Sequence, residues 1–158
     1  MQSVELKAVI DAKENVSDVQ CYVRALLIQQ GNQRECYAWS DDRLYLYRTE
    51  MDYQVYIHHP PALILDSPLE TGHKWTIQNE VVGEYGSTVT ATETFEVVGP
   101  AKITVPAGSF DTIEIKITHT DGSVATGTRW YALGVGLVEE VSTLYGVTTT
   151  VELESFQL

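Results

Sequence analysis

Histidines are the side chains in this sequence best suited to metal binding or proton transfer, and there are four of them. His58 and His59 are adjacent, so on a strand they point to opposite faces and cannot both ligate one metal. His73 follows a glycine and His119 stands just before Asp121-Gly122, so we expect both at exposed loop ends. The sequence therefore predicts no metal site and no histidine general base.

Serine and glycine motifs give no better indication of catalysis or cofactor binding. Ser109 lies in an Ala-Gly-Ser-Phe turn without a neighbouring base, and the sequence has no G-x-S-x-G motif. Gly134 and Gly136 lie in a strand pattern with no helix after them, which argues against dinucleotide and phosphate loops. We expect a protein that is not an enzyme, with no catalytic residues and no cofactor.

Carboxylates are the over-represented group, with 22 acidic against 10 basic side chains. Asp41, Asp42, Glu50 and Asp52 bracket a short predicted hairpin, but the Asp-x-Asp-x-Asp-Gly spacing of a calcium loop is missing. A solvated acidic surface is the simpler explanation. Glycoside hydrolysis depends on how far apart the fold places two carboxylates, so a hydrolase using clustered carboxylates stays open as an alternative.

Length and charge narrow the class of protein further. A chain of 158 residues with 44% hydrophobic residues predicts one globular domain over residues 1–158. A net charge of −12 without a basic stripe predicts no nucleic-acid partner and no adhesion to anionic lipid. No run approaches the roughly 18 consecutive apolar residues of a membrane-spanning helix, and the start lacks the regions of a secretory signal.

Alternation with period two recurs along the whole chain and predicts an all-β domain. Short turn signals indicate antiparallel hairpins, and a sheet this large must curl. We expect a large curved antiparallel sheet or half-barrel, with meander topology and little helix. The predicted strands cover residues 4–12, 18–29, 34–40, 44–48, 53–58, 74–82, 87–98, 103–105, 112–120, 124–132, 135–143 and 147–156.

Two hairpin registers follow from the turn signals. A two-residue turn at Asp121-Gly122 pairs residues whose numbers sum to 243, which sets Ile113 against Trp130 and Glu114 against Arg129. Trp130 then shares one buried face with Ile113, Ile115, Ile117 and Leu137. For the last hairpin, a three-residue loop at 144–146 avoids a Glu139–Glu152 pair by setting Leu137 against Leu153 and Val141 against Thr149.

The two cysteines are predicted to be free and half-buried. A turn at Gly31-Asn32 sets Cys36 opposite Leu27, about 20 Å from Cys21 at the usual rise per strand residue. Cysteine usage therefore leaves the redox compartment open.

Residues 59–68 contain three prolines and interrupt the strand pattern. We expect a loop here, with one helical turn at 62–65, that crosses an open end of the sheet as a lid. Aromatic side chains either fill the interior or line an apolar pocket beneath the lid. The candidate ligand or lid residues are Pro60, Pro61, Leu63, Leu65, Trp75 and Trp130.

Three segments resemble a known signature. They are residues 95–111 (FEVVGPAKITVPAGSFD), 129–139 (RWYALGVGLVE) and 68–75 (PLETGHKW). Together they resemble a family of uncharacterised, largely exported or lipid-anchored bacterial β-domains, with a curved sheet distantly similar to that of the lipoprotein-localisation factors. The chain departs from the pattern at Pro100-Ala101, where glutamate often follows the glycine, and at Leu133, where proline is usual.

The resemblance implies a location in the cell envelope and transfers no catalytic residue. We expect a non-enzymatic domain that binds a hydrophobic small molecule or an envelope protein on its concave face. A purely structural module of a larger assembly is the other alternative. The envelope location requires a signal or anchor upstream of this chain, and a native start at Met1 would instead indicate the cytoplasm.

Overall fold

The computed structural model describes residues 2–28, 33–52, 54–82, 88–120 and 126–157, and these form an all-β fold without a helix. This confirms the predicted fold class. The strands are β1 (Gln2–Val16), β2 (Val19–Leu27), β3 (Gln33–Ser40), β4 (Arg43–Met51), β5 (Gln54–Leu65), β6 (Lys74–Val82), β7 (Thr88–Val105), β8 (Gly108–Thr120), β9 (Thr126–Ala132), β10 (Gly136–Leu144) and β11 (Val147–Phe156).

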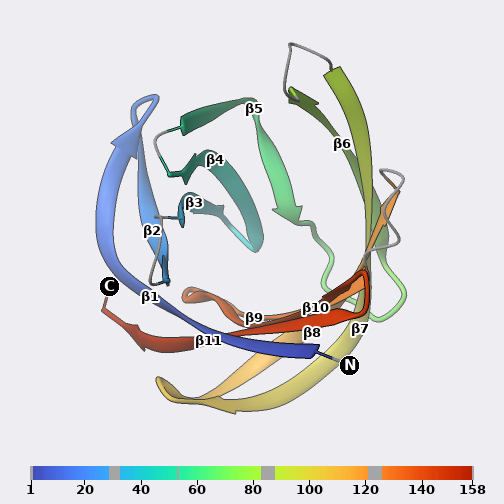
Figure 1. Ribbon diagram of the computed structural model, residues 1–158. Helices are drawn as coiled ribbons and strands as arrows, with labels where there is room; N and C mark the ends of the chain where they lie inside the picture. Colours follow the sequence, from blue (N-terminus) through green and yellow to red (C-terminus); the bar gives the residue numbers. More distant parts are fainter. Residues whose placement is uncertain (1, 29–32, 53, 83–87, 121–125, 158) are drawn as a thin grey trace.

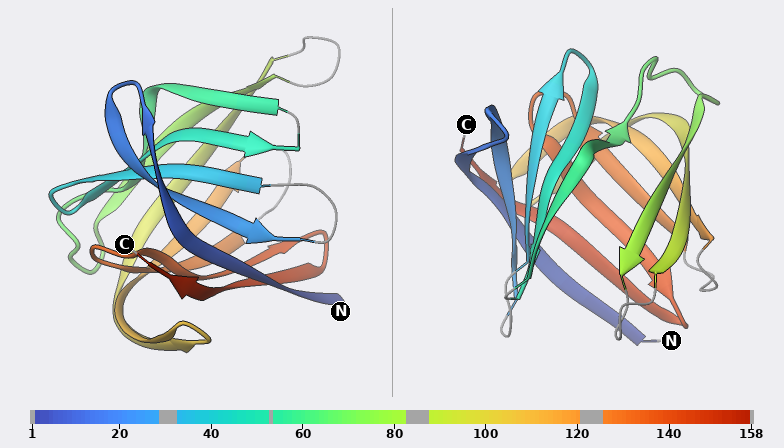
Figure 2. Two further views of the ribbon diagram at one scale, coloured as in Figure 1. Left: turned by 90° about the vertical axis from the view of Figure 1, so that its left-hand side faces the viewer. Right: turned by 90° about the horizontal axis from the view of Figure 1, so that it is seen from above.

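All eleven strands belong to one sheet, in the order β5-β4-β3-β2-β1-β11-β10-β9-β8-β7-β6. The sheet consists of two meanders, β1 to β5 and β6 to β11, which form opposite walls in Figure 2. They join through β1 and β11, which pair in parallel rather than in the antiparallel manner expected. Consecutive strands alternate in direction along the chain, so the first and the eleventh strand run the same way. They can therefore pair only in parallel.

The sheet curls until its two edge strands, β5 and β6, face each other across what we call the seam (Figure 1). Accumulated twist drives this curling in a sheet of eleven strands. The result is a nearly closed barrel, with β5 and β6 not paired in the sheet.

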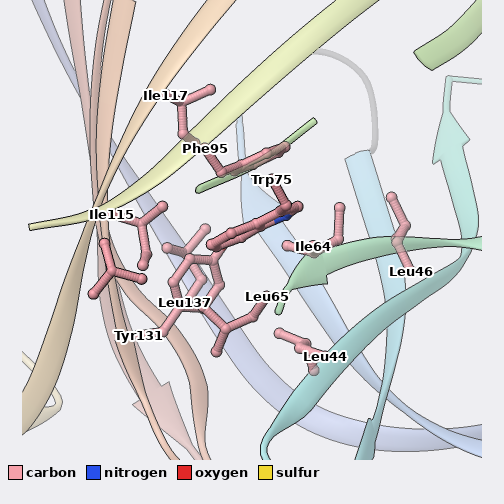
Figure 3. Close-up of a cluster of buried hydrophobic side chains, with 11 residues drawn as sticks. Leu44, Leu46, Ile64, Leu65, Trp75, Phe95, Ile115, Ile117, Tyr131 and Leu137 are labelled. Carbon is pink, nitrogen blue, oxygen red and sulfur yellow. The ribbon is translucent and has the colours of Figure 1, made fainter. Parts of the chain in front are cut away.

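The interior is filled by apolar side chains from both walls. Trp75 and Phe95 stack with ring centroids 5.1 Å apart and planes 3° apart. Figure 3 shows these rings between the isoleucines of β8 and Leu44, Ile64 and Leu65 of the opposite wall. The sequence left open whether the aromatic residues fill the core or line a cavity, and for these two rings the structure shows core packing.

The predicted β8–β9 register is wrong by one residue. Ile113 pairs with Tyr131 and Glu114 with Trp130, so the residue numbers sum to 244 and not 243. A two-residue turn pairs residues i and i+3, whose numbers sum to an odd value, so the sum of 244 does not fit such a turn. The predicted turn itself lies outside the described residues. Tyr131 therefore takes the buried place beside the isoleucines, and Trp130 faces the outside of the barrel.

The predicted β10–β11 register is also wrong, and here the reason is visible. Glu139 does pair with Glu152, through a two-residue turn at Tyr145-Gly146. Lys7 of β1 pairs with Glu152 from the other side and forms an ion pair with it. A contact between residues 145 positions apart offsets the repulsion that the hairpin alone would suffer.

The predicted strands at 87–98 and 103–105 are instead one continuous strand, β7, with a bulge just before Gly99. Gly99 has φ +148°, and a Cβ atom there would lie 3.3 Å from Thr71 Oγ1. The positive φ and the close approach of Thr71, from the segment before β6, both favour glycine at this position.

The cysteines lie on the outward face of β2 and β3, in an apolar cluster with Val16, Val23 and Ala38. Cys36 pairs with Val23 and not with Leu27, and both thiols are free and fully buried rather than half-buried. The predicted Gly31-Asn32 turn lies outside the described residues. Burial raises the pKa of Cys36 to about 11.

Candidate binding surfaces at the seam and the barrel end

The proline-rich segment is an edge strand and not a lid. Residues 54–65 form β5, without the expected helical turn at 62–65. Its pairing with β4 is interrupted between Ile57, which faces Arg48, and Ala62, which faces Leu46. Pro60 and Pro61 lie in this interruption, at the edge of the sheet, where a missing N–H costs no ladder hydrogen bond.

The six candidate ligand or lid residues separate into three groups. Leu65 and Trp75 are buried in the main core and Leu63 packs against it. Pro60 is exposed and Pro61 half-buried on β5. Trp130 lies on the outer face, paired with Glu114 and Glu139, so its assignment to this region is wrong.

The first half of β5 exposes apolar side chains that the sequence analysis did not single out. Val55 is 60% exposed, Tyr56 44% and Ile57 50%, and the neighbouring Met51 of β4 is 49% exposed. Residues 54–65 contain no Asp, Glu, Lys or Arg. The alternation of β-branched and aromatic residues was a signal for a strand, but only the topology shows that this strand is an edge.

The connection from β5 to β6 is held by polar contacts. Asp66 accepts from Arg43 Nε at 3.0 Å and lies 2.9 Å from His73 Nε2. Burial opposes ionisation of Asp66, but His73 and Arg43 hold its pKa below its usual value. His73 is therefore a half-buried structural residue, and not the exposed loop-end residue that we expected.

A polar cluster inside the barrel joins the two walls. From β2 and β3, Arg24 Nη1 lies 3.3 Å from Glu35 Oε2, which also accepts from the Tyr37 hydroxyl at 2.6 Å. From β9 and β10, Arg129 Nε lies 3.3 Å from Glu140 Oε1. Burial opposes ionisation of Glu140, but Arg129 and Arg24 keep its pKa low. The paired charges let the interior hold ionised groups.

Two of the three remaining histidines, His58 and His119, also have structural partners. His58 is half-buried and its Nε2 lies 3.0 Å from Thr49 Oγ1, whereas His59 is exposed. His119 Nδ1 lies 3.0 Å from Glu93 Oε1, so it too is half-buried rather than an exposed loop end. In the part of the chain that the structure describes, no group of three His, Cys, Asp or Glu side chains could hold a metal ion.

The end of the barrel at the β3–β4 and β9–β10 turns has an open cleft of about 400 Å³. Its walls include the rings of Tyr22 and Trp39, the carboxylates of Asp41 and Asp42, and the exposed Leu133. A smaller cavity of about 10 Å³ lies beside it, lined by the same two rings and by Arg24 and Tyr37. The sequence placed Asp41 and Asp42 on a hairpin but gave no indication that aromatic rings from β2 and β3 would join them.

Comparison with known proteins adds no relative. No protein-family model matches the sequence, no curated protein matches it, and no solved structure matches the fold. The resemblance to exported bacterial β-domains stays a prediction. Among the described residues, no helix is long and apolar enough to cross a membrane.

Proposed function

We propose that this protein is a non-enzymatic binding domain that holds a partner protein by adding one strand of the partner to β5. The observation that carries the proposal is the uncharged, unpaired edge at residues 54–57, with Val55, Tyr56 and Ile57 each exposed by 44% or more. An open strand edge offers backbone N–H and C=O groups to an added strand, and its side chains provide specificity.

The edge lacks the usual protection against such pairing. Proteins commonly shield edge strands with charged residues, prolines or bulges. In β5 the bulge and the two prolines shield residues 58–61 only, which leaves the preceding four residues open. A short unprotected edge of this kind supports a weak, reversible complex rather than an obligate one.

The partner's chemistry follows from charge. The chain carries −12, and Asp52 is exposed beside the open segment. An extended segment in which β-branched residues alternate with Lys or Arg would match both the apolar side chains of the edge and the negative charge of the protein. A second copy of the chain would bring the same −12 charge to the interface and is disfavoured.

The other functions considered have less support. An apolar ligand inside the barrel needs a hollow interior, whereas the cavity beside Arg24 measures about 10 Å³, room for about one water. A hydrolase would need carboxyls with raised pKa values in a cleft. Burial and the charge of Glu152 raise the pKa of Glu139, but Glu139 lies opposite Trp130 on the outer face of the sheet.

A synthetic peptide of alternating Lys and Val or Thr residues is the probe for strand addition. We expect it to slow hydrogen exchange at the backbone amides of residues 54–57. Val55→Lys should abolish this protection, because a lysine on an edge strand opposes pairing. Leu144→Lys is the matched control, since Leu144 is an exposed apolar residue at 42% on β10.

Equal loss of binding in both variants, or protection spread over the whole sheet, would refute strand addition at β5. Sedimentation of the protein alone provides a second readout. If the protein self-associates and Val55→Lys abolishes the self-association, a second copy of the chain occupies the edge. That result would reject the basic partner.

The location in the cell envelope remains part of the proposal and rests on the resemblance alone. The native reading frame and cell fractionation test it. A gene that opens at Met1, with the protein in the cytoplasmic fraction, would leave a cytoplasmic binding module that uses the same edge.

A further inference from the structure

The open cleft at the barrel end combines features that are independent of the β5 edge. Two strands, a β-turn and the β9–β10 connection contribute to it, and its volume of about 400 Å³ lies within the range of small-molecule sites. Leu133 is 57% exposed at its rim. Asp41 is exposed in the turn, while Asp42 Oδ2 accepts a hydrogen bond from Ser67 Oγ at 2.7 Å.

A buried, incompletely paired cation lies behind the cleft. Arg24 is 5% exposed, and its Nε has no hydrogen-bond acceptor among the described residues. Arg24 lines the small cavity, which Tyr22 and Trp39 separate from the cleft. A buried N–H without an acceptor is costly, and the cavity of about 10 Å³ fits one water that would supply the acceptor. Arg24 therefore belongs to the barrel interior, which leaves Tyr22, Trp39 and the rim residues to contact a ligand in the cleft.

The lining eliminates most classes of ligand. The net charge of −12 and two rim carboxylates repel an anion. The same carboxylates attract a cation, but at the Tyr22 ring a cation would meet the like charge of Lys13, whose Nζ lies 5.4 Å from the ring centroid. A wholly apolar molecule would bury the carboxylates without hydrogen-bond donors. A neutral molecule with several hydroxyl donors and an apolar face satisfies all three conditions.

We propose that this cleft binds a neutral sugar. The C–H face of the pyranose ring lies against Trp39 and Tyr22, and its hydroxyls donate to the carboxylates of Asp41 and Asp42. The site is distinct from the β5 edge and does not depend on the proposed strand addition.

Titration of the full chain with sugars, followed in amide and indole ¹H–¹⁵N spectra, tests the proposal. The panel contains glucose, galactose, mannose and N-acetylglucosamine, with glucuronate and choline as charged probes. We expect at least one neutral sugar to shift the Trp39 indole and Gly134 amide signals saturably, and both charged probes to bind more weakly. No saturable shift with any neutral sugar, or stronger binding of either charged probe, would overturn the assignment.

A pair of isosteric variants separates a specific site from a change in net charge. Asp41→Asn should weaken binding by about tenfold, the effect of losing one hydrogen bond to a charged group. Asp18→Asn is the control, because Asp18 has the same left-handed backbone, φ 64° against 57° for Asp41, and does not line the cleft. Equal weakening in the two variants would reject the hydroxyl contact with Asp41.

Discussion

Truncation of two neighbouring aromatic residues on β9 tests the barrel's register directly. Tyr131 is 1% exposed and belongs to the main core, whereas Trp130 is partly exposed and belongs to none of the core clusters of the described residues. If the residue numbers summed to 243, the two side chains would exchange faces. We therefore compare Tyr131→Ala with Trp130→Ala.

The expected difference is large. Removal of a fully buried aromatic side chain costs about 3–5 kcal/mol of folding free energy, from lost transfer energy and the cavity left behind. Tyr131→Ala also takes the hydroxyl acceptor from Arg129 Nη1, a long contact of 3.5 Å. Trp130→Ala removes a side chain that water already reaches, so we expect a loss of less than about 2 kcal/mol.

Urea unfolding followed by far-ultraviolet circular dichroism measures both losses. Tyr131→Phe is the control, because it keeps the ring and should lose only about 1 kcal/mol. If Tyr131→Ala does not fold, Ile115→Val of β8, expected to cost about 0.5–1.5 kcal/mol, replaces it as a probe of the same face. A Trp130→Ala variant as unstable as Tyr131→Ala would refute the register of β8 and β9.

Two further predictions concern titratable groups. Burial and the charge of Glu152 raise the folded-state pKa of Glu139, so ionisation of this carboxyl opposes folding. At pH 7, Glu139→Gln should therefore unfold at a higher urea concentration than the parent protein. The difference should vanish below pH 4.5, the ordinary pKa of the group, because Glu139 is then protonated in both the folded and the unfolded state. A parent protein equally stable or more stable at pH 7 would contradict this. Cys21 and Cys36 are buried with raised pKa values, so iodoacetamide should modify them slowly in the folded protein and rapidly in urea; stoichiometric native labelling would show that the thiols are exposed.

Local patterns predicted the strands well and their partners poorly. Alternation identified the β8 and β9 strands, but the register between them depended on a turn whose length the sequence does not fix. The β10–β11 register was rejected because Glu139 would face Glu152, and the compensating Lys7 comes from the opposite end of the chain. Parallel pairing of β1 with β11 follows from the number of strands, which was misjudged when β7 was divided at Gly99.

The candidate binding surfaces were even harder to predict from local sequence patterns than the strand partners were. Three prolines correctly marked residues 59–68 as unable to lie inside a sheet, but an edge strand satisfies that condition as well as a loop does. The cleft brings Tyr22 beside Asp41 through the curvature of β2 and β3, which has no local signature. Arg24 and Glu35 can form an ion pair because the β2–β3 register sets them opposite each other. Such buried polar pairs could therefore not be predicted before the register was known.

The open seam itself has a cause in the sequence. Closing the barrel would require β5 to pair with β6 as an antiparallel neighbour. Pro60 and Pro61 offer no N–H groups for such a ladder, and the interruption at residues 58–61 already displaces β5 from regular pairing with β4. At the other end of β5, Leu65 meets Trp75 in the core and holds the two edges near each other through side chains. The chain thus keeps an edge unpaired beside a closed core, which is the geometry that an added strand requires.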